Sequence, residues 1–168
     1  MNAQQRLFLV QARSDFYVFQ ILRDEWRKAT IPACHALHYL QMATEKLGRA
    51  RAWRHGIAIT SHAGFRAFLN DLQSNRDTQN SLGYAKQNES WTHLIRKFGP
   101  LALSIESLAP AISRNIPNPE YPWPRDTPTA CPAEYDFPIW EELQATSHGR
   151  QFIKLLVNLF ATAEHYLT

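Results

Sequence analysis

Two histidines three residues apart are the first residues whose types and spacing suggest chemistry. His35 and His38 lie in a segment with helical periodicity, and Glu45 follows seven residues after His38. On a helix these side chains share one side, where imidazole nitrogens and a carboxylate are suitable metal ligands. A metal site needs three or four ligands, and no second HxxH or ExxH motif supplies the rest. We therefore predict no metal and no cofactor, and keep a metal-dependent helical-bundle enzyme as an alternative.

His62 is a candidate for acid–base chemistry. It lies in the first turn of a predicted helix that Thr60 or Ser61 can cap, where the helix N-terminus disfavours a charged imidazole. No nearby Asp or Glu would orient His62, and adjacent residues on a helix do not face each other. The chain also lacks the GxSxG, GxxxxGK[ST], GxGxxG and HExxH motifs, so the corresponding hydrolase, nucleotide-binding and zinc-protease chemistries have no support.

The densest basic cluster contains Lys46, Arg49, Arg51 and Arg54, followed by His55. Lys46, Arg49 and Arg54 share a broad helical face, from which phosphate contacts would depend on salt and not on base sequence. The alternative interpretation is that these cations compensate the helix dipole and are otherwise solvated.

Helical periodicity predicts the elements that must position these residues. Four main helices are expected, at residues 5–27, 32–54, 61–74 and 150–166. Between them, residues 74–89 are polar and indicate a loop, and Gly99-Pro100 is expected to end one short helix and begin the next. No segment shows convincing strand alternation. We therefore predict an all-α fold, a single domain over residues 1–168 built as an up-and-down bundle of four to five helices.

Residues 114–147 interrupt the helical pattern. They contain seven of the ten prolines, and their large aromatic residues are Tyr121, Trp123, Tyr135, Phe137 and Trp140. Disordered linkers rarely carry so many large aromatic side chains, so we expect an ordered, extended Pro-rich strap across the bundle, before the last helix. A short helical turn is expected near residues 139–143. The rings would anchor the strap to the bundle or, alternatively, stack on nucleic-acid bases.

Composition places the chain among ordinary globular domains. Its 168 residues are 45% hydrophobic and 20% charged, which excludes disordered, collagen-like and disulfide-rich classes. No apolar run is long enough to cross a membrane, and the N-terminal residues do not resemble a signal peptide. Cys34 and Cys131 form no CxxC pair, so we expect reduced thiols and a cytoplasmic location.

The charge is unevenly distributed although the net charge is only +3. In residues 115–147, Arg125 is the only cation among six acidic side chains, whereas the residues before this segment are basic. The acidic segment either folds back and neutralises the basic body or leaves a basic face for nucleic acid.

Short motifs occur in a defined order along the predicted helices. They are ARSDF at 12–16, QMATEKLGRA at 41–50, TSH at 60–62 and EYP at 120–122. In this order they resemble the A-x-x-D-hydrophobic, Q-x-A-x-E-K-x-x-K-A, Thr/Ser-His and R-Y-P motifs of HEPN domains, small helical bundles of bacterial and archaeal nucleotide and RNA biology. Arg49 replaces the second lysine of the family pattern, and the resemblance covers most of residues 5–166.

The resemblance implies an up-and-down bundle that often dimerises. Many members are RNases in which Arg is followed, four to six residues later, by His, near the start of the last conserved helix and in a site shared across the dimer. In this chain Arg114-Asn115 is followed by Tyr121 and not by His, and Glu120 stands where related sequences have Arg. The RNase residues are therefore expected to be absent. Members without them are binding or accessory modules, some beside nucleotidyltransferases or in defence and toxin–antitoxin systems.

These observations lead to one hypothesis and two alternatives. We expect a non-catalytic HEPN-like module that forms a homodimer and binds a partner protein, a nucleotide or RNA. Its candidate binding residues are Lys46, Arg49, Arg54, His62, Arg114 and Tyr121. The first alternative is a degenerate ribonuclease that uses Arg114, His62 and Tyr121, and the second is the metal-dependent enzyme that uses His35, His38 and Glu45.

Overall fold

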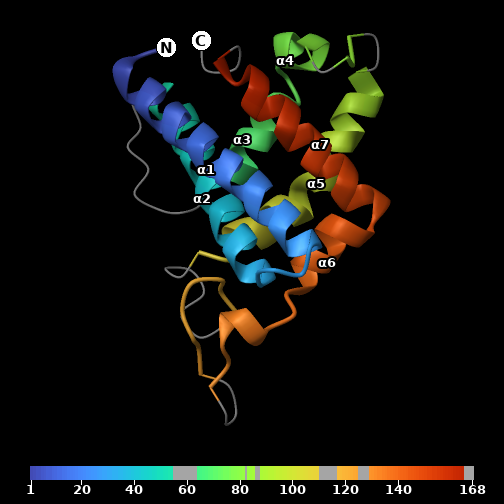
Figure 1. The fold of residues 1–168 in the computed structure, drawn as a ribbon. Helices are drawn as coiled ribbons and strands as arrows, with labels where there is room; N and C mark the ends of the chain where they lie inside the picture. Colours follow the sequence, from blue (N-terminus) through green and yellow to red (C-terminus); the bar gives the residue numbers. More distant parts are fainter. Residues whose placement is uncertain (55–63, 82, 86–87, 110–116, 125–128, 165–168) are drawn as a thin grey trace.

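The computed structural model describes residues 1–54, 64–81, 83–85, 88–109, 117–124 and 129–164. Within these ranges the chain forms α-helices and one short 3₁₀ helix, with no strand (Figure 1). The helices are α1 (Ala3–Arg27), α2 (Ala33–Arg54), α3 (Phe65–Leu72), α4 (Arg76–Ser81), α5 (Asn88–Glu106), η1 (Pro132–Glu134), α6 (Pro138–Ala145) and α7 (Ser147–Thr162). The predicted all-α bundle is confirmed. Among the described residues, none of these helices combines the length and apolar character that crossing a membrane requires.

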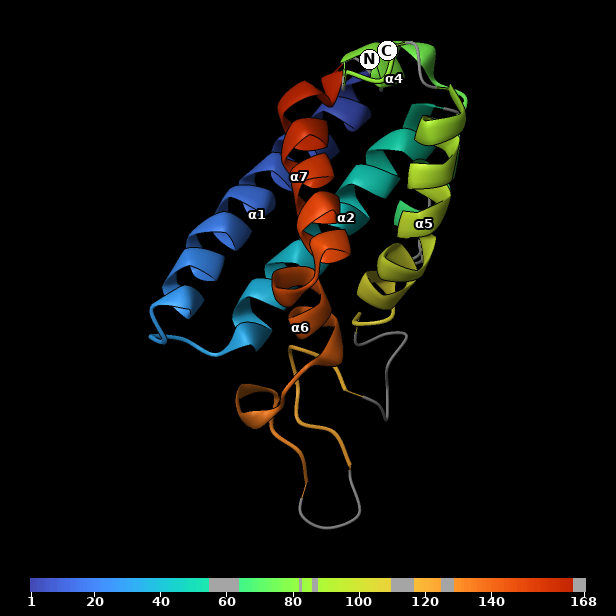
Figure 2. The same cartoon turned by 90° about the vertical axis from the view of Figure 1, so that its right-hand side faces the viewer.

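Helices α1 and α2 pair along their length, and the predicted extents of both helices are confirmed within two residues (Figure 2). The side chain of Asn2 accepts a hydrogen bond from the Gln5 amide and caps α1, while the Gln5 side chain accepts one from the Asn2 amide. The turn between the helices has Ala29 at a positive φ of 56°. Helix α2 contacts α1, α3 and α5 and is the central helix of the bundle.

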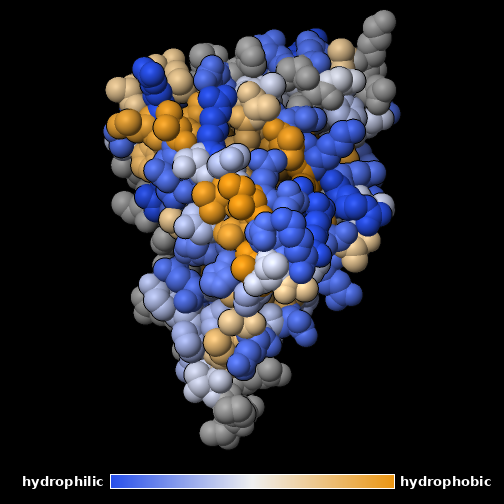
Figure 3. All heavy atoms as spheres, in the orientation of Figure 1, coloured by the Kyte–Doolittle hydropathy of each residue, from blue (hydrophilic) through white to orange (hydrophobic). Residues whose placement is uncertain are grey.

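The hydrophobic core lies between the inner side of α1 and the helices that pack against it, which include α2 and α7. The inner side of α1 buries Leu9, Ala12, Phe16 and Phe19. Hydrophobic side chains also lie on the outside of the molecule, over α1 (Figure 3). The guanidinium of Arg13 reaches from α1 to the end of α7, where its Nε donates to the Phe160 carbonyl at 3.0 Å. Arg13 therefore ties α1 to the C-terminal end of α7.

Helix α5 supports both ends of α3. Oε1 of Glu106 accepts hydrogen bonds from the backbone amides of Gly64 at 2.8 Å and Arg66 at 2.9 Å, before and within the first turn of α3. The indole Nε1 of Trp91 donates to the carbonyl of Leu72, the last residue of α3, at 2.9 Å. These contacts satisfy polar groups that a helix leaves without partners at its ends.

Two sequence predictions in this region are wrong. The segment expected as a loop contains α4, which begins after Asn75, whose side chain accepts a hydrogen bond from the Thr78 amide at 2.9 Å. Helix α5 runs through Pro100 without ending, because Pro100 lies on the exposed side, where water can satisfy the carbonyl that loses its helical donor. Leu103 on the same helix is 46% exposed.

The Pro-rich segment lies at one end of the bundle and not across it (Figures 1 and 2). We call its described residues 117–124 and 129–137 the arm. Within the arm, Trp123 and Ala130 exchange backbone hydrogen bonds of 3.2 and 3.1 Å, and η1 contacts α2. The rings of Trp123, Tyr135 and Phe137 pack together, with centroids 4.9 to 6.3 Å apart. The arm thus has its own aromatic cluster, which is why it keeps an ordered shape beyond the helices.

The helical turn expected at the end of this segment is confirmed as α6. Trp140 of α6 is buried and packs edge-on against Phe19 and Trp26 of α1, with centroids 6.5 and 5.0 Å apart. This aromatic side chain anchors the segment to the bundle, as the sequence predicted.

Candidate functional site

The motif residues of α1 and α2 meet in a buried ion pair. Nζ of Lys46 on α2 lies 2.6 Å from Oδ2 of Asp15 on α1, and both side chains are largely buried. The side-chain amide of Gln11 donates to the other carboxylate oxygen of Asp15 at 2.9 Å. Asp15 and Lys46 are 31 residues apart in sequence, so this contact depends on the pairing of the two helices. The Asp15–Lys46 ion pair therefore connects α1 to α2.

A second group of motif residues forms a row on α2. The side-chain amide of Gln41 donates to Oε2 of Glu45 at 3.0 Å, and Oε1 of Glu45 lies 2.7 Å from Nη2 of Arg49. The spacing of four residues places these side chains one above the other on the helix. Glu45 is buried, so Arg49 compensates a carboxylate that would otherwise lose its hydration.

The structure brings the predicted cations Lys46 and Arg49 onto neighbouring turns, but both contact carboxylates of their own chain. Arg51 of the same basic cluster forms an ion pair with Asp71 of α3. Sequence reasoning missed these partners because it weighed the charges of α2 alone. The anion contact predicted for Lys46 and Arg49 would have to share these cations with Asp15 and Glu45.

The remaining candidate binding residues are dispersed. Arg54 is exposed at the end of α2. Tyr121 is 57% exposed on the arm, where its pKa is raised by a hydrogen bond to Glu120 and by the charge of that carboxylate. His62 and Arg114 lie outside the described residues. The ribonuclease alternative, which uses Arg114, His62 and Tyr121, therefore stays a prediction.

The residues of the metal alternative do not form one cluster. His35 is exposed, and Nδ1 of His38 lies 3.9 Å from Oε2 of Glu120 on the arm. Glu45 is bound by Arg49 and lies about 10 Å further along the helix axis, since each residue advances a helix by about 1.5 Å. Within the described part of the chain, no group of three or more His, Cys, Asp or Glu side chains is arranged to hold a metal ion. The convergence of His35, His38 and Glu45 that the metal alternative requires is therefore not present in the structure described.

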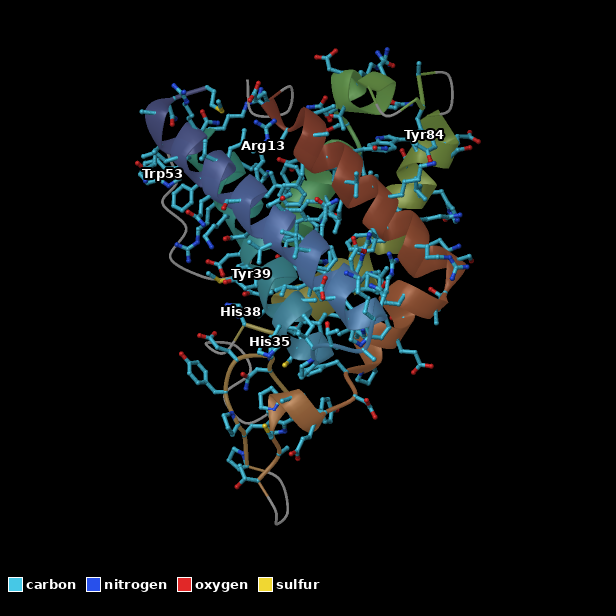
Figure 4. The ribbon with its side chains drawn as sticks, viewed as in Figure 1. Arg13, His35, His38, Tyr39, Trp53 and Tyr84 are labelled. Carbon is cyan, nitrogen blue, oxygen red and sulfur yellow. The ribbon has the colours of Figure 1, made fainter. Side chains whose placement is uncertain are left out.

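Among the described residues, Glu120 of the acidic segment approaches α2 at His38. The pair of His38 and Glu120 connects the arm to α2, and the ring of His38 lies edge-on to that of Tyr39, with centroids 5.3 Å apart. This contact holds the arm beside the first half of α2 (Figure 4).

The outward side of α1 carries a second apolar row, which we call the outer α1 face. Leu7, Val10, Tyr17 and Ile21 are 44 to 64% exposed, and the exposed Ser14 completes their spacing of three and four residues. Most of the exposed large hydrophobic side chains in the described residues lie on this helix. Helical periodicity alone does not single out this face; the signal for it in the sequence is the heptad spacing of the second row.

No protein-family model, curated protein or solved structure matches this chain. The geometry defines its class: an all-α bundle whose motif residues pair internally and whose first helix has one apolar face toward the core and another toward water. A contiguous exposed apolar face on a folded domain is typical of a protein–protein contact.

Proposed function

We propose that the chain is a non-catalytic, HEPN-like binding module that acts as a homodimer, with the outer α1 face as the contact between copies. The observation that carries this proposal is the row Leu7, Val10, Tyr17 and Ile21. Burial of apolar surface contributes about 25 cal/mol per Å², so this row favours association over exposure to water.

A second copy fits the row because the row can pair with itself. A heptad spacing keeps one side of a helix against a neighbouring helix over several turns, and α1 has 25 residues. In a two-fold dimer the same surface is buried on both copies. Ser14 lies midway between Leu7 and Ile21, where a small side chain permits close approach of two helices.

The dimer would serve as an accessory module for a partner enzyme in a bacterial defence or toxin–antitoxin system. The contact between the Asp15 and Lys46 motifs supports the HEPN resemblance, because motif residues of two helices meet in one network. The engagement of Lys46 and Arg49 with carboxylates favours a protein partner over a nucleotide or RNA at this part of the molecule. The unbonded thiols of Cys34 and Cys131 fit the proposed cytoplasmic location.

The test is the molar mass of the purified protein, measured by light scattering across a concentration series. We expect the mass of two chains for the wild type and of one chain for the double variant Val10→Glu/Tyr17→Glu. Leu103→Glu is the matched control, because Leu103 is also an exposed large hydrophobic residue but lies on α5. The proposal would be overturned by a wild-type protein that stays monomeric at the highest concentration of the series. It would also be overturned if Leu103→Glu dissociated to the same extent as the double variant.

A further inference from the structure

A groove lies between α5 and α7 over part of their length. The two helices meet where Phe98 packs against His148 and Phe152, with ring centroids 5.0 and 5.1 Å apart. Beside this contact lies a cavity of about 580 Å³, which Tyr84 borders. Small-molecule sites commonly have volumes of about 300 to 1,000 Å³. The groove therefore has the size of a small-ligand site.

Apolar side chains line part of this groove. Leu94 of α5 and Leu155 of α7 contribute accessible surface to it, whereas Phe98 behind them is fully buried. The ring of Tyr84 lies 5.3 Å from that of Trp91, which keeps the tyrosine beside the groove. A planar apolar group can contact these side chains on one face and Tyr84 on another.

The rim of the groove carries lysines. Lys154 of α7 lines it, and an adjoining hollow that shares Ser90, Leu94 and Gln151 is lined by Lys97 of α5, together with His93 and the carboxylate of Glu89. Both lysines are exposed, and neither forms an ion pair with a carboxylate in the described parts of the chain. They differ in this respect from Lys46 and Arg49. The side chains of Ser90 and Gln151 add hydrogen-bond donors beside the two cations.

We propose that the groove between α5 and α7 binds a small anion with a planar, apolar body, of the class of aromatic phosphates and carboxylates. The body lies against Leu94, Leu155 and Tyr84, and the anionic group contacts Lys154, with Lys97 in the adjoining hollow as a second cation. This site lies on other helices than the outer α1 face, so it stands or falls independently of the proposed dimer.

Calorimetric titration with 1-naphthyl phosphate tests the site, with 1-naphthol and inorganic phosphate as the two half-ligands. We expect 1-naphthyl phosphate to bind at least tenfold more tightly than either half-ligand, because only the whole molecule uses both the apolar surface and the lysines. Lys154→Gln should weaken its binding about tenfold, since a hydrogen bond to a charged group is lost. The affinity for 1-naphthol should stay unchanged.

Arg6→Gln on α1 is the matched control, because it removes an equal charge far from the groove and should leave the affinity unchanged. Lys154 is exposed, so its replacement should preserve the fold, which circular dichroism can verify. Absence of binding at millimolar 1-naphthyl phosphate would overturn the proposal. So would equal losses for Lys154→Gln and Arg6→Gln, or binding of 1-naphthol as tight as that of the phosphate.

Discussion

Asp15 and Lys46 form an ion pair across α1 and α2, with 2.6 Å between Oδ2 and Nζ, in a region where both side chains are largely buried. Each residue belongs to a short motif on its own helix, and neither motif contains both members of the pair. The two motifs thus become one structural unit only when the helices pack. This relationship gives the motif charges a role in stability.

Removal of one member of this pair should destabilise the protein strongly, and the losses caused by the two single removals should not be additive. In Asp15→Ala, Lys46 keeps a charge without its carboxylate in a poorly hydrated position, and we expect a loss of about 3 kcal/mol in the free energy of unfolding. The double variant Asp15→Ala/Lys46→Ala should lose clearly less than the sum of the two single variants. Urea unfolding of all four proteins measures the coupling, and strictly additive losses would contradict the pairing.

Gly48 should not tolerate a side chain. A Cβ atom added there would lie 2.5 Å from the carbonyl carbon of Gly64 and 2.8 Å from the amide nitrogen of Phe65, where α2 approaches the start of α3. We expect Gly48→Ala to lower the free energy of unfolding by about 1–3 kcal/mol.

Gly99 of α5 is the matched comparison, because a Cβ atom added there would meet nothing within 4 Å except its chain neighbours, of which Pro100 is one. Gly99→Ala should therefore cost clearly less than Gly48→Ala, since the clash of its Cβ atom with the ring of Pro100 is local and the helix preference of alanine offsets part of it. Thermal unfolding of the two variants distinguishes them, and equal midpoints would argue against the close approach of α2 and α3.

The two cysteines should differ in their reactivity toward iodoacetamide. Burial raises the pKa of the Cys34 thiol, so less of it is the reactive thiolate at a given pH, whereas Cys131 is exposed. At pH 8 we expect Cys131 to be alkylated first and Cys34 to react mainly at higher pH or after unfolding. Mass spectrometry of the wild type and of Cys131→Ser follows each site, and equal rates at pH 8 would contradict the burial of Cys34.

The sequence predicts the long helices well because local rules are sufficient for them. The inner apolar row of α1 and the apolar stripe of α2 have helical spacing over many turns, and Pro32 marks the start of α2. These local rules do not predict helix α4, because it is polar and depends on specific contacts. One of them is the hydrogen bond that the side-chain amide of Gln79 donates to the Tyr84 carbonyl at 2.8 Å.

The candidate sites are harder to predict because they depend on what lies opposite each charge. Lys46 and Lys154 are both helical lysines in sequence, but the structure places Asp15 against the first and a groove beside the second. The outer α1 face is visible in the sequence as a second apolar row. Only the packing of α2 shows which of the two rows faces the core.

The contacts of Glu106 and Trp91 at the two ends of α3 make its persistence depend on α5. A helix of eight residues is too short to persist alone in water. Transient opening of α5 would remove both end contacts at once. Amide protons of α3 and α5 should therefore exchange with solvent as one cooperative unit, separately from the longer α1.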